Sequence, residues 1–251
     1  MRTREEFRPD PSLSREEMED LQREVAARAV FADDLAFDPD DVRWTPDDAR
    51  DSAPVVVGVD QAFREEEAVS AVVATRDGEV VERATGRAPL ELPYIPGLLS
   101  FREAPAILDA LSNLHTDPDL LVLDGSGRIH FREAGIATHV GVILDTPAVG
   151  VAKNLLCGEP AEPLEGHLEA GERVPILADD SMTALEGETV GYAYQSRQYP
   201  NPEKRHINPL YVSPGHRVSA ETTVSLVAAL CDGYKLPEPT RLADADAGDA
   251  A

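Results

Sequence analysis

Two aspartates stand at the ends of apolar strand patterns, where they could share a metal ion. Asp60 closes the run VVVGVD, and Asp124 closes the run LLVLD. Ligand sites in open α/β sheets form beyond the carboxyl ends of such strands. Two carboxylates there repel each other unless they share a cation, and Mg²⁺ favours one or two carboxylates together with water and phosphate oxygens. Either aspartate alone also fits a turn or a helix cap, but the pair favours a metal site.

Three further residues could complete this chemistry. Lys153 is the only lysine in the first 203 residues, and beside a phosphodiester it would neutralise the charge that builds up during hydrolysis. Glu103 could orient water at the metal, or it could close a helix capping box with Ser100. His216, in SPGHR, could transfer a proton or bind the metal through water, although a lone loop histidine more often does neither.

The run PYIPGLLSFRE offers a rigid aromatic side chain beside these acids. Tyr94 lies between Pro93 and the pair Ile95-Pro96, and prolines restrict both their own φ and the residue before them. A tyrosine held stiffly at a loop tip could open a base stack. Gly125, Gly127 and Gly135, around the second aspartate, are either turn glycines or positions where the backbone approaches a flat ligand such as an extruded base.

The elements that would position these residues follow from hydrophobic patterning. Buried-strand patterns cover 55–63, 119–124 and 148–153, and Asp77-Gly78 predicts a hairpin between two further strands. Further helices and strands are expected in the ranges 14–30, 100–111, 133–144, 190–197, 209–217 and 219–230. The pattern predicts one α/β domain spanning 1–251, with a central mixed sheet of antiparallel hairpin strands and parallel strands flanked by helices. The core is expected at about 53–235, between an acidic helical segment (1–50) and a solvated acidic tail (243–251).

Composition and charge indicate the kind of cell and partner that the protein has. The chain has 251 residues, with 47 acidic against 23 basic side chains and a net charge of −24; only three residues are lysines. Such a surface suits a halophilic cytoplasm, and we expect a cytoplasmic protein because no signal or membrane segment is visible. We also expect a monomer. The acids concentrate in 158–189. The segment 190–217 instead carries four basic residues and one acid, which favours an anionic partner there.

Long stretches of the chain resemble the endonuclease V family. The matching runs are VGVDQAF, PYIPGLLSFREAPAILDAL, PDLLVLDGSGRIHFREAGIATHVGVILDTPAVGVAKNLLCG, PLYVSPGHRVS and GYKLPEPTRLAD. The resemblance implies an RNase H-like fold and a DNA repair enzyme that uses Mg²⁺, or Mn²⁺ in its place. Such an enzyme hydrolyses the second phosphodiester bond 3′ to deoxyinosine, or to another deaminated base, and leaves the base attached.

The resemblance also implies roles for individual residues. Asp60 and Asp124 match the metal-binding aspartates, Glu103 the third acid, and Lys153 and His216 the catalytic lysine and histidine. The run Pro93, Tyr94, Ile95 and Pro96 matches the wedge that replaces the flipped base. Gly125, Gly135 and Ile136 fall in the hypoxanthine pocket, and His130 and Arg102 match phosphate-contacting or supporting positions.

Two departures from the family pattern accompany these matches. Gln61-Ala62-Phe63 replaces a serine–tyrosine pair found after the first aspartate in many bacterial members, and Phe131-Arg132-Glu133 replaces a proline followed by basic residues. Other hypotheses remain open at this point. They are an inosine-specific ribonuclease or another RNase H-like nuclease and, outside enzymes, a lesion-binding protein or an acidic DNA mimic.

Overall fold

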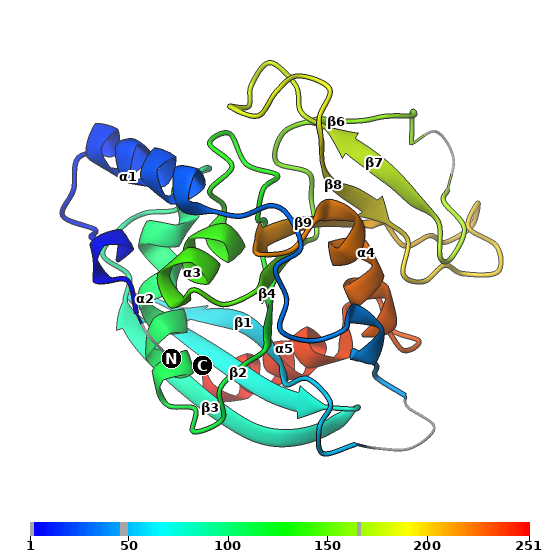
Figure 1. Ribbon diagram of the computed structural model, residues 1–251, viewed down its shortest axis with the longest axis horizontal. Helices are drawn as coiled ribbons and strands as arrows, with labels where there is room; N and C mark the ends of the chain where they lie inside the picture. The colour runs from blue at the N-terminus through cyan, green and yellow to red at the C-terminus, as the bar shows by residue number, and fades with distance from the viewer. Residues whose placement is uncertain (1–2, 46–49, 165–166) are drawn as a thin grey trace.

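A computed structural model describes residues 3–45, 50–164 and 167–251 (Figure 1). Small parts of the predicted N-terminal segment (1–2 and 46–49) and of the acidic stretch (165–166) lie outside the described residues. The elements in chain order are α1 (Arg15–Arg28), β1 (Val56–Arg64), β2 (Glu67–Arg76), β3 (Glu79–Pro89), α2 (Leu99–Ser112), β4 (Leu120–Asp124), α3 (Ile136–Leu144), β5 (Ala148–Ala152), β6 (Glu159–Pro160), β7 (Arg173–Leu177), β8 (Thr189–Tyr194), β9 (Leu210–His216), α4 (Ala220–Ala229) and α5 (Glu238–Ala250). Short 3-10 turns lie at Glu5–Phe7 and Pro39–Asp41.

The strands form one mixed sheet in the order β3-β2-β1-β4-β5-β9-β8-β7-β6. The first three strands pair antiparallel, and the predicted turn at Asp77-Gly78 joins β2 to β3. β1, β4 and β5 run parallel in the centre, and β9 returns antiparallel to β5. The predicted mixed sheet of hairpin and parallel strands is therefore confirmed.

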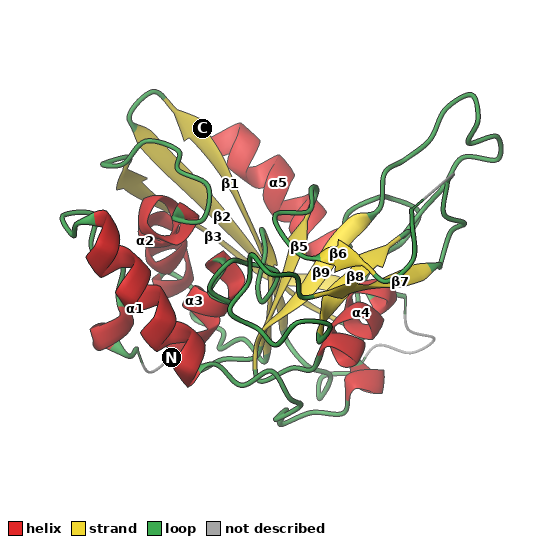
Figure 2. Ribbon diagram, turned by 90° about the horizontal axis from the view of Figure 1, so that it is seen from above, coloured by secondary structure: helices red, strands yellow, loops and turns green. Residues whose placement is uncertain are grey.

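Helices cover both faces of this sheet (Figure 2). On one face α2 and α3 pack in an apolar core with residues of β1, β2 and β4, and α1 lies outside α3. On the other face α4 packs against β8 and β9, while α5 crosses β1 and β2. Strands buried on both faces explain the continuous apolar runs in the sequence. None of the helices in the described residues is long and apolar enough to span a membrane.

The predicted solvated tail at 243–251 is wrong, because this segment completes helix α5. Ala243 and Ala247 are buried against the sheet. Gly58 in β1 makes this docking possible, since a Cβ on Gly58 would lie only 2.1 Å from the carbonyl carbon of Pro239. A pattern of alternating alanine and aspartate thus forms an amphipathic helix whose small side chains face the sheet.

Two helix starts differ in their capping. Ser14 and Glu17 form the predicted capping box of α1. The alternative of a capping box from Ser100 and Glu103 does not hold, because α2 begins at Leu99 and its N-cap, Leu98, has no side-chain hydrogen bond. Glu103 lies inside the first turns of α2 and is buried. Its carboxylate therefore does not serve as a cap.

Candidate active site

The fold brings the two strand-end aspartates side by side. β1 and β4 are parallel neighbours, with Val59 opposite Leu123, and Asp60 and Asp124 follow one residue further along. Both aspartates line a cavity of about 450 Å³ at the carboxyl ends of the central strands. The two carboxylates interact electrostatically, and the negative charge of Asp124 raises the pKa of Asp60.

Lys153 follows β5, the next strand of the sheet. Its Nζ donates a hydrogen bond of 2.7 Å to Oδ2 of Asp124. Partial burial lowers the pKa of Lys153, but the hydrogen bond to Asp124 and the nearby negative charges outweigh this effect, so the pKa lies above its usual value. The lysine is therefore a fixed positive charge at the edge of the carboxylate pair.

Asp60 is held in a state that favours a cation. Its side chain is buried, and Oδ1 accepts a hydrogen bond of 2.6 Å from the backbone N–H of Gln61. Its other oxygen, Oδ2, is buried with no hydrogen-bond partner among the described residues. Burial raises the pKa of Asp60 to about 8, and the charge of Asp124 adds to the effect. A cation placed at Oδ2 would offset both the burial of the Asp60 carboxylate and its repulsion by Asp124.

Glu103 faces the same cavity from helix α2. Burial raises the pKa of its carboxyl to about 7; Arg102 opposes this shift and Asp124 adds to it. A carboxyl with a pKa near neutrality can accept or release a proton at working pH. The structure thus brings Asp60, Asp124, Glu103 and Lys153 together, as the sequence predicted.

The sequence-based prediction missed a fourth acid near this cluster. Asp244, on helix α5, raises the pKa values of Asp60 and Lys153 through its charge. It belongs to the run GYKLPEPTRLAD, so the signal lay in a stretch already matched to the family. The sequence did not indicate a role for Asp244, because the tail was expected to be solvated.

The structure does not place His216 in the cavity, which corrects the prediction. β9 runs antiparallel to β5, so the C-terminal end of β9 lies beside Ala148, at the opposite end of the sheet from Lys153. There the imidazole of His216 contacts a carboxylate oxygen of Asp145 at 3.2 Å and accepts a hydrogen bond from the backbone N–H of Val30. Its position in this structure is that of a buried structural histidine.

The proline-rich loop borders the cavity. Tyr94 is 66% exposed and lines the cavity mouth together with Pro96, while Pro93 is exposed beside it. Ile95 instead packs into a small apolar cluster with Leu98. The loop is therefore anchored by one aliphatic side chain and leaves the aromatic ring free.

Arg102 braces the base of this loop rather than lining the cavity. Its guanidinium donates to the carbonyl of Leu92 and lies over the ring of Phe63 at 5.4 Å. Phe63 belongs to the run that departs from the family pattern, and its ring is half exposed at the cavity wall. The supporting role is thus favoured for Arg102 over a phosphate contact.

The residues predicted for the base pocket line the other wall of the cavity. Gly125, Gly135 and Ile136 all contact the same space. Gly125 has φ +137°, and a Cβ there would lie 2.5 Å from Cγ2 of Ile136. Only glycine allows this turn to bring the backbone against the pocket wall. The close-approach interpretation is favoured over simple turn glycines at this position.

Comparison with known proteins identifies the family. The family model described as Endonuclease V matches residues 40–245. The chain belongs to the endonuclease V family. An endonuclease V from Halobacterium salinarum is 60% identical over 98% of both chains, and one from Haloarcula marismortui is 56% identical over 98% of this chain and 96% of its own.

Solved structures of the family share this fold. The Streptomyces avermitilis endonuclease V has a TM-score of 0.75 at 32% identity, covering 94% of this chain and 92% of its own. The catalytic domain of human endonuclease V has a TM-score of 0.76 at 31% identity and covers 94% of both chains. The fold is RNase H-like, as expected, and nuclease activity is favoured over a DNA mimic.

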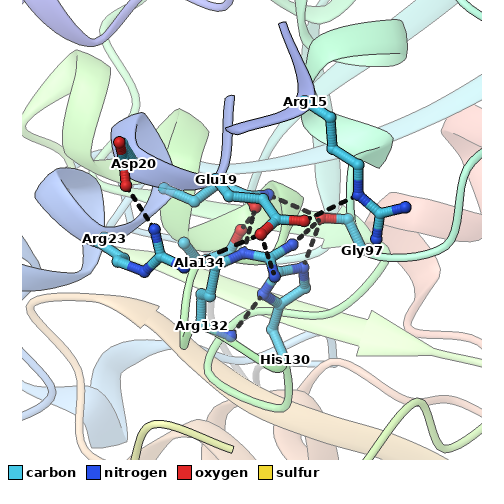
Figure 3. A network of polar contacts seen from close by, with 9 residues as sticks. Arg15, Glu19, Asp20, Arg23, Gly97, His130, Arg132 and Ala134 are labelled. Atoms are coloured by element: carbon cyan, nitrogen blue, oxygen red, sulfur yellow. Dashed lines mark hydrogen bonds and ion pairs between the residues drawn. The ribbon is translucent and has the colours of Figure 1, made fainter. Parts of the chain in front are cut away.

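A network behind the cavity joins helix α1 to both of its walls (Figure 3). Three donors converge on the carbonyl oxygen of Gly97, the residue after the Tyr94 loop: Gln22 Nε2 at 2.9 Å, His130 Nε2 at 3.1 Å and Arg132 Nη2 at 3.1 Å. Gln22 also donates to Ala134 O at 3.4 Å and accepts from Arg132 Nε at 2.8 Å. The buried Gln22 amide therefore ties the Tyr94 loop to the base-pocket loop.

His130 belongs to this network and also lines the cavity. It is buried, and burial lowers its pKa to about 4, so the ring is neutral and fixed at Gly97. The supporting alternative for this residue is favoured. Gln22 lies outside the part of the chain matched by the family model, which is why family motifs did not reveal it.

Replacing Gln22 by leucine should loosen both loops together. Gln22→Leu removes three hydrogen bonds and leaves the partly buried Arg132 without this acceptor, so we expect a loss of about 1–3 kcal/mol in unfolding free energy. Binding of the substrate should weaken in addition. Thermal denaturation and an affinity titration test this, with Glu24→Ala on the exposed side of α1 as the matched control. Equal effects of the two substitutions would contradict the bridging role.

Proton binding at the cavity should make stability depend on pH and on metal. Asp60 and Glu103 have folded pKa values of about 8 and about 7, well above the roughly 4 of an unfolded chain. The folded state therefore binds more protons between these limits, and stability falls as pH rises through this window. A divalent cation competes with those protons, so its stabilising effect should grow from about pH 6 to about pH 8.

Melting temperatures with and without Mg²⁺ across this pH range would measure the effect. Asp60→Asn should abolish the growth of the cation effect with pH. A cation effect that is the same at both ends of the range would contradict our assignment of these carboxyls.

Proposed function

We propose that this family member is a magnesium-dependent endodeoxyribonuclease that recognises deoxyinosine and cuts the second phosphodiester bond on its 3′ side, leaving the base in place. Other deaminated bases belong to the same substrate class. The observation that carries the proposal is the paired Asp60 and Asp124 carboxylates in the wall of a base-sized cavity beneath an exposed tyrosine. A monomer in a salt-rich cytoplasm belongs to this proposal.

The residues present fit a magnesium ion. The described residues contain no group of three or more His, Cys, Asp or Glu side chains that could cage a metal. Mg²⁺ does not require such a cage, because it is usually held by one or two carboxylates together with water and substrate phosphates. Asp60, with its unpartnered buried oxygen, and Asp124 supply those two carboxylates. When bound, the ion would polarise the phosphate and lower the pKa of water.

The remaining side chains then have distinct tasks. Lys153, fixed 2.7 Å from Asp124, offers a positive charge to the phosphate as negative charge develops on it. Glu103, with a pKa of about 7, can accept a proton from the attacking water. Asp244 adds negative charge that favours a cation at the pair. The glycine-lined wall accepts the extruded base, and Tyr94 fills the space that the base leaves in the stack.

DNA containing inosine is the substrate to test first. An endonuclease V from Ciona intestinalis, with a TM-score of 0.71 and 24% identity, was solved with a 24mer DNA containing an inosine followed by a ribo-adenosine. The cavity beside Gly125 and Ile136 is consistent with a flat base of this kind.

Removal of the Tyr94 ring should weaken binding without harming the fold. Stacking of a base on an aromatic ring contributes about 1–3 kcal/mol, so Tyr94→Ala should reduce affinity for inosine DNA by about 10- to 100-fold. Because the side chain is 66% exposed, the melting temperature should stay unchanged. Tyr94→Phe should bind as the original protein does, and Leu185→Ala, another exposed apolar residue, serves as control. Unchanged affinity of Tyr94→Ala would show that the ring is not a wedge.

A nicking assay tests the proposal as a whole. A labelled duplex with one deoxyinosine is incubated with and without Mg²⁺ in concentrated KCl, and the cut position is mapped; a matched RNA strand with inosine is included. We expect a single magnesium-dependent nick at the second bond 3′ to the lesion. Cutting only of the RNA strand, or equal cutting of a duplex without inosine, would overturn the proposed specificity.

A further inference from the structure

A second groove continues from the candidate active site. It encloses about 470 Å³, and Lys153, Asn154 and Leu155 line both this groove and the cavity. Its far side is formed by the loop between β8 and β9, which projects at the edge of the molecule (Figure 1). The described residues that line the groove include no carboxylate. This is unusual on a chain with a net charge of −24.

The loop beside the groove carries cations without carboxylate partners. Most arginines in the described residues form ion pairs, for example Arg83 with Asp246 and Arg173 with Glu221. Arg197 and Arg205 instead lie over the ring of Tyr199, at 5.5 and 4.4 Å from its centroid. No carboxylate of the described residues pairs with either guanidinium. Both are therefore free to bind an anion.

The loop is held in place by two buried or half-buried glutamines. Gln195 Nε2 donates to the carbonyls of Arg197 and Ile207, at 2.6 and 2.9 Å. Oε1 of Gln198 accepts from the backbone N–H groups of Tyr199 and Ile207, both at 3.0 Å. A loop fixed in this way presents its cations at a low entropic cost, because little ordering remains when a ligand binds.

The three lysines of the chain lie at the active site, in the loop and after the helix α4. Lys153 stands at the active site and Lys204 lies in the loop. Burial lowers the pKa of Lys235, and the charge of Lys153 lowers it further, so these two ammonium groups lie close to each other. The carbonyl of Lys235 accepts a hydrogen bond of 2.6 Å from Ser196, at the start of the loop. The positive charges of Lys153 and Lys235 thus lie near the cavity, and Ser196 ties the backbone at Lys235 to the loop.

We propose that this groove binds the sugar–phosphate backbone of the cut strand on the 3′ side of the cleaved bond. The inference rests on the proposed function. The base-pocket residues line the cavity and not the groove, and the two spaces share only the segment from Lys153 to Leu155. Since the cut is 3′ to the extruded base, the strand that leaves the active site away from that base is its 3′ part. Free guanidinium and ammonium groups suit phosphates, and the rings of His167 and His206, stacked at 4.2 Å, add a surface for bases.

Flank lengths and salt dependence test the groove directly. Inosine duplexes are shortened stepwise either 3′ to the cut or 5′ to the lesion, and affinity is measured over a range of KCl concentrations in which the protein stays folded. The variant combines Arg197→Ala, Lys204→Ala and Arg205→Ala; the control combines Arg83→Ala and Arg87→Ala on β3. Each lost phosphate contact lowers the slope of log affinity against log salt by about 0.9 in a duplex.

We expect the original protein and the control to gain affinity as the 3′ flank is lengthened. The triple variant should lose this gain, bind the longest duplex about tenfold more weakly, and show a salt slope smaller by about 2.7, or about 0.9 for each cation removed. Its dependence on the 5′ flank should be unchanged. A triple variant that keeps both the 3′ gain and the slope overturns the groove assignment, while the position of the nick still tests the proposed function separately. If the original protein makes no magnesium-dependent nick at inosine, both proposals fall.

Discussion

Asp124→Ala should abolish cutting of inosine DNA, with a loss of at least about a thousandfold in rate. The substitution removes one of the two carboxylates that would hold the cation and the only carboxylate among the described residues that forms an ion pair with Lys153. The fold should survive, because the Asp124 side chain is partly exposed and ends its strand. Loss of the Asp124 charge should also lower the pKa of Asp60, because that charge raises it in the original protein. Single-turnover nicking assays and thermal denaturation measure the two effects.

Asp119→Asn is the matched control for this prediction. Asp119 immediately precedes the same strand, and its carboxylate accepts a hydrogen bond of 2.8 Å from the backbone N–H of Val55. The amide oxygen of asparagine can keep that bond, so nicking should stay near its original rate. Magnesium-dependent nicking by Asp124→Ala at more than a few per cent of that rate would refute the role of the pair.

Lys153→Met should lower the rate of the cutting step by about 10²- to 10³-fold, the usual effect of losing one group that stabilises a transition state. Lys153 is the only residue of the described chain that forms an ion pair with Asp124, and its raised pKa keeps it charged at neutral pH. Methionine preserves the length of the side chain but not the charge. The expected change is in the rate at saturating substrate, measured under single-turnover conditions.

Two comparisons separate this catalytic effect from a general loss of positive charge. Lys153→Arg should recover part of the rate, because it restores a cation beside Asp124. Arg83→Met, at the far edge of the sheet, should leave the rate unchanged. If the Lys153→Met protein cuts at the original rate once it is saturated with DNA, the lysine contributes to DNA binding and not to the cutting step.

Local patterns predicted most of the elements and the central carboxylate pair. The run VVVGVD and the turn at Asp77-Gly78 carry strong local signals, since a buried strand and a two-residue turn are each specified by neighbouring residues. Asp60 and Asp124 were found because each ends such a strand. Their proximity depends only on β1 and β4 being parallel neighbours, as the α/β pattern predicted.

The predictions failed for residues whose position depends on distant parts of the chain. His216 has a suggestive motif, but the direction of β9 relative to β5 decides which end of the sheet it reaches. Asp244 was missed because docking of α5 requires the space left by Gly58, a residue far away in sequence. Gln22 could not be found from its surroundings in α1, because its partners at Gly97 and Ala134 belong to other segments.

The most direct test is a calorimetric titration of the metal-free protein with Mn²⁺ or Mg²⁺ near pH 8. The proteins compared are the original chain, Asp60→Asn, Asp124→Asn and, as a control, Asp249→Asn at an exposed position of α5. Our account predicts that the original chain and the control bind the cation with release of protons, and that either active-site substitution removes this binding. Unchanged cation binding by both Asp60→Asn and Asp124→Asn would contradict it.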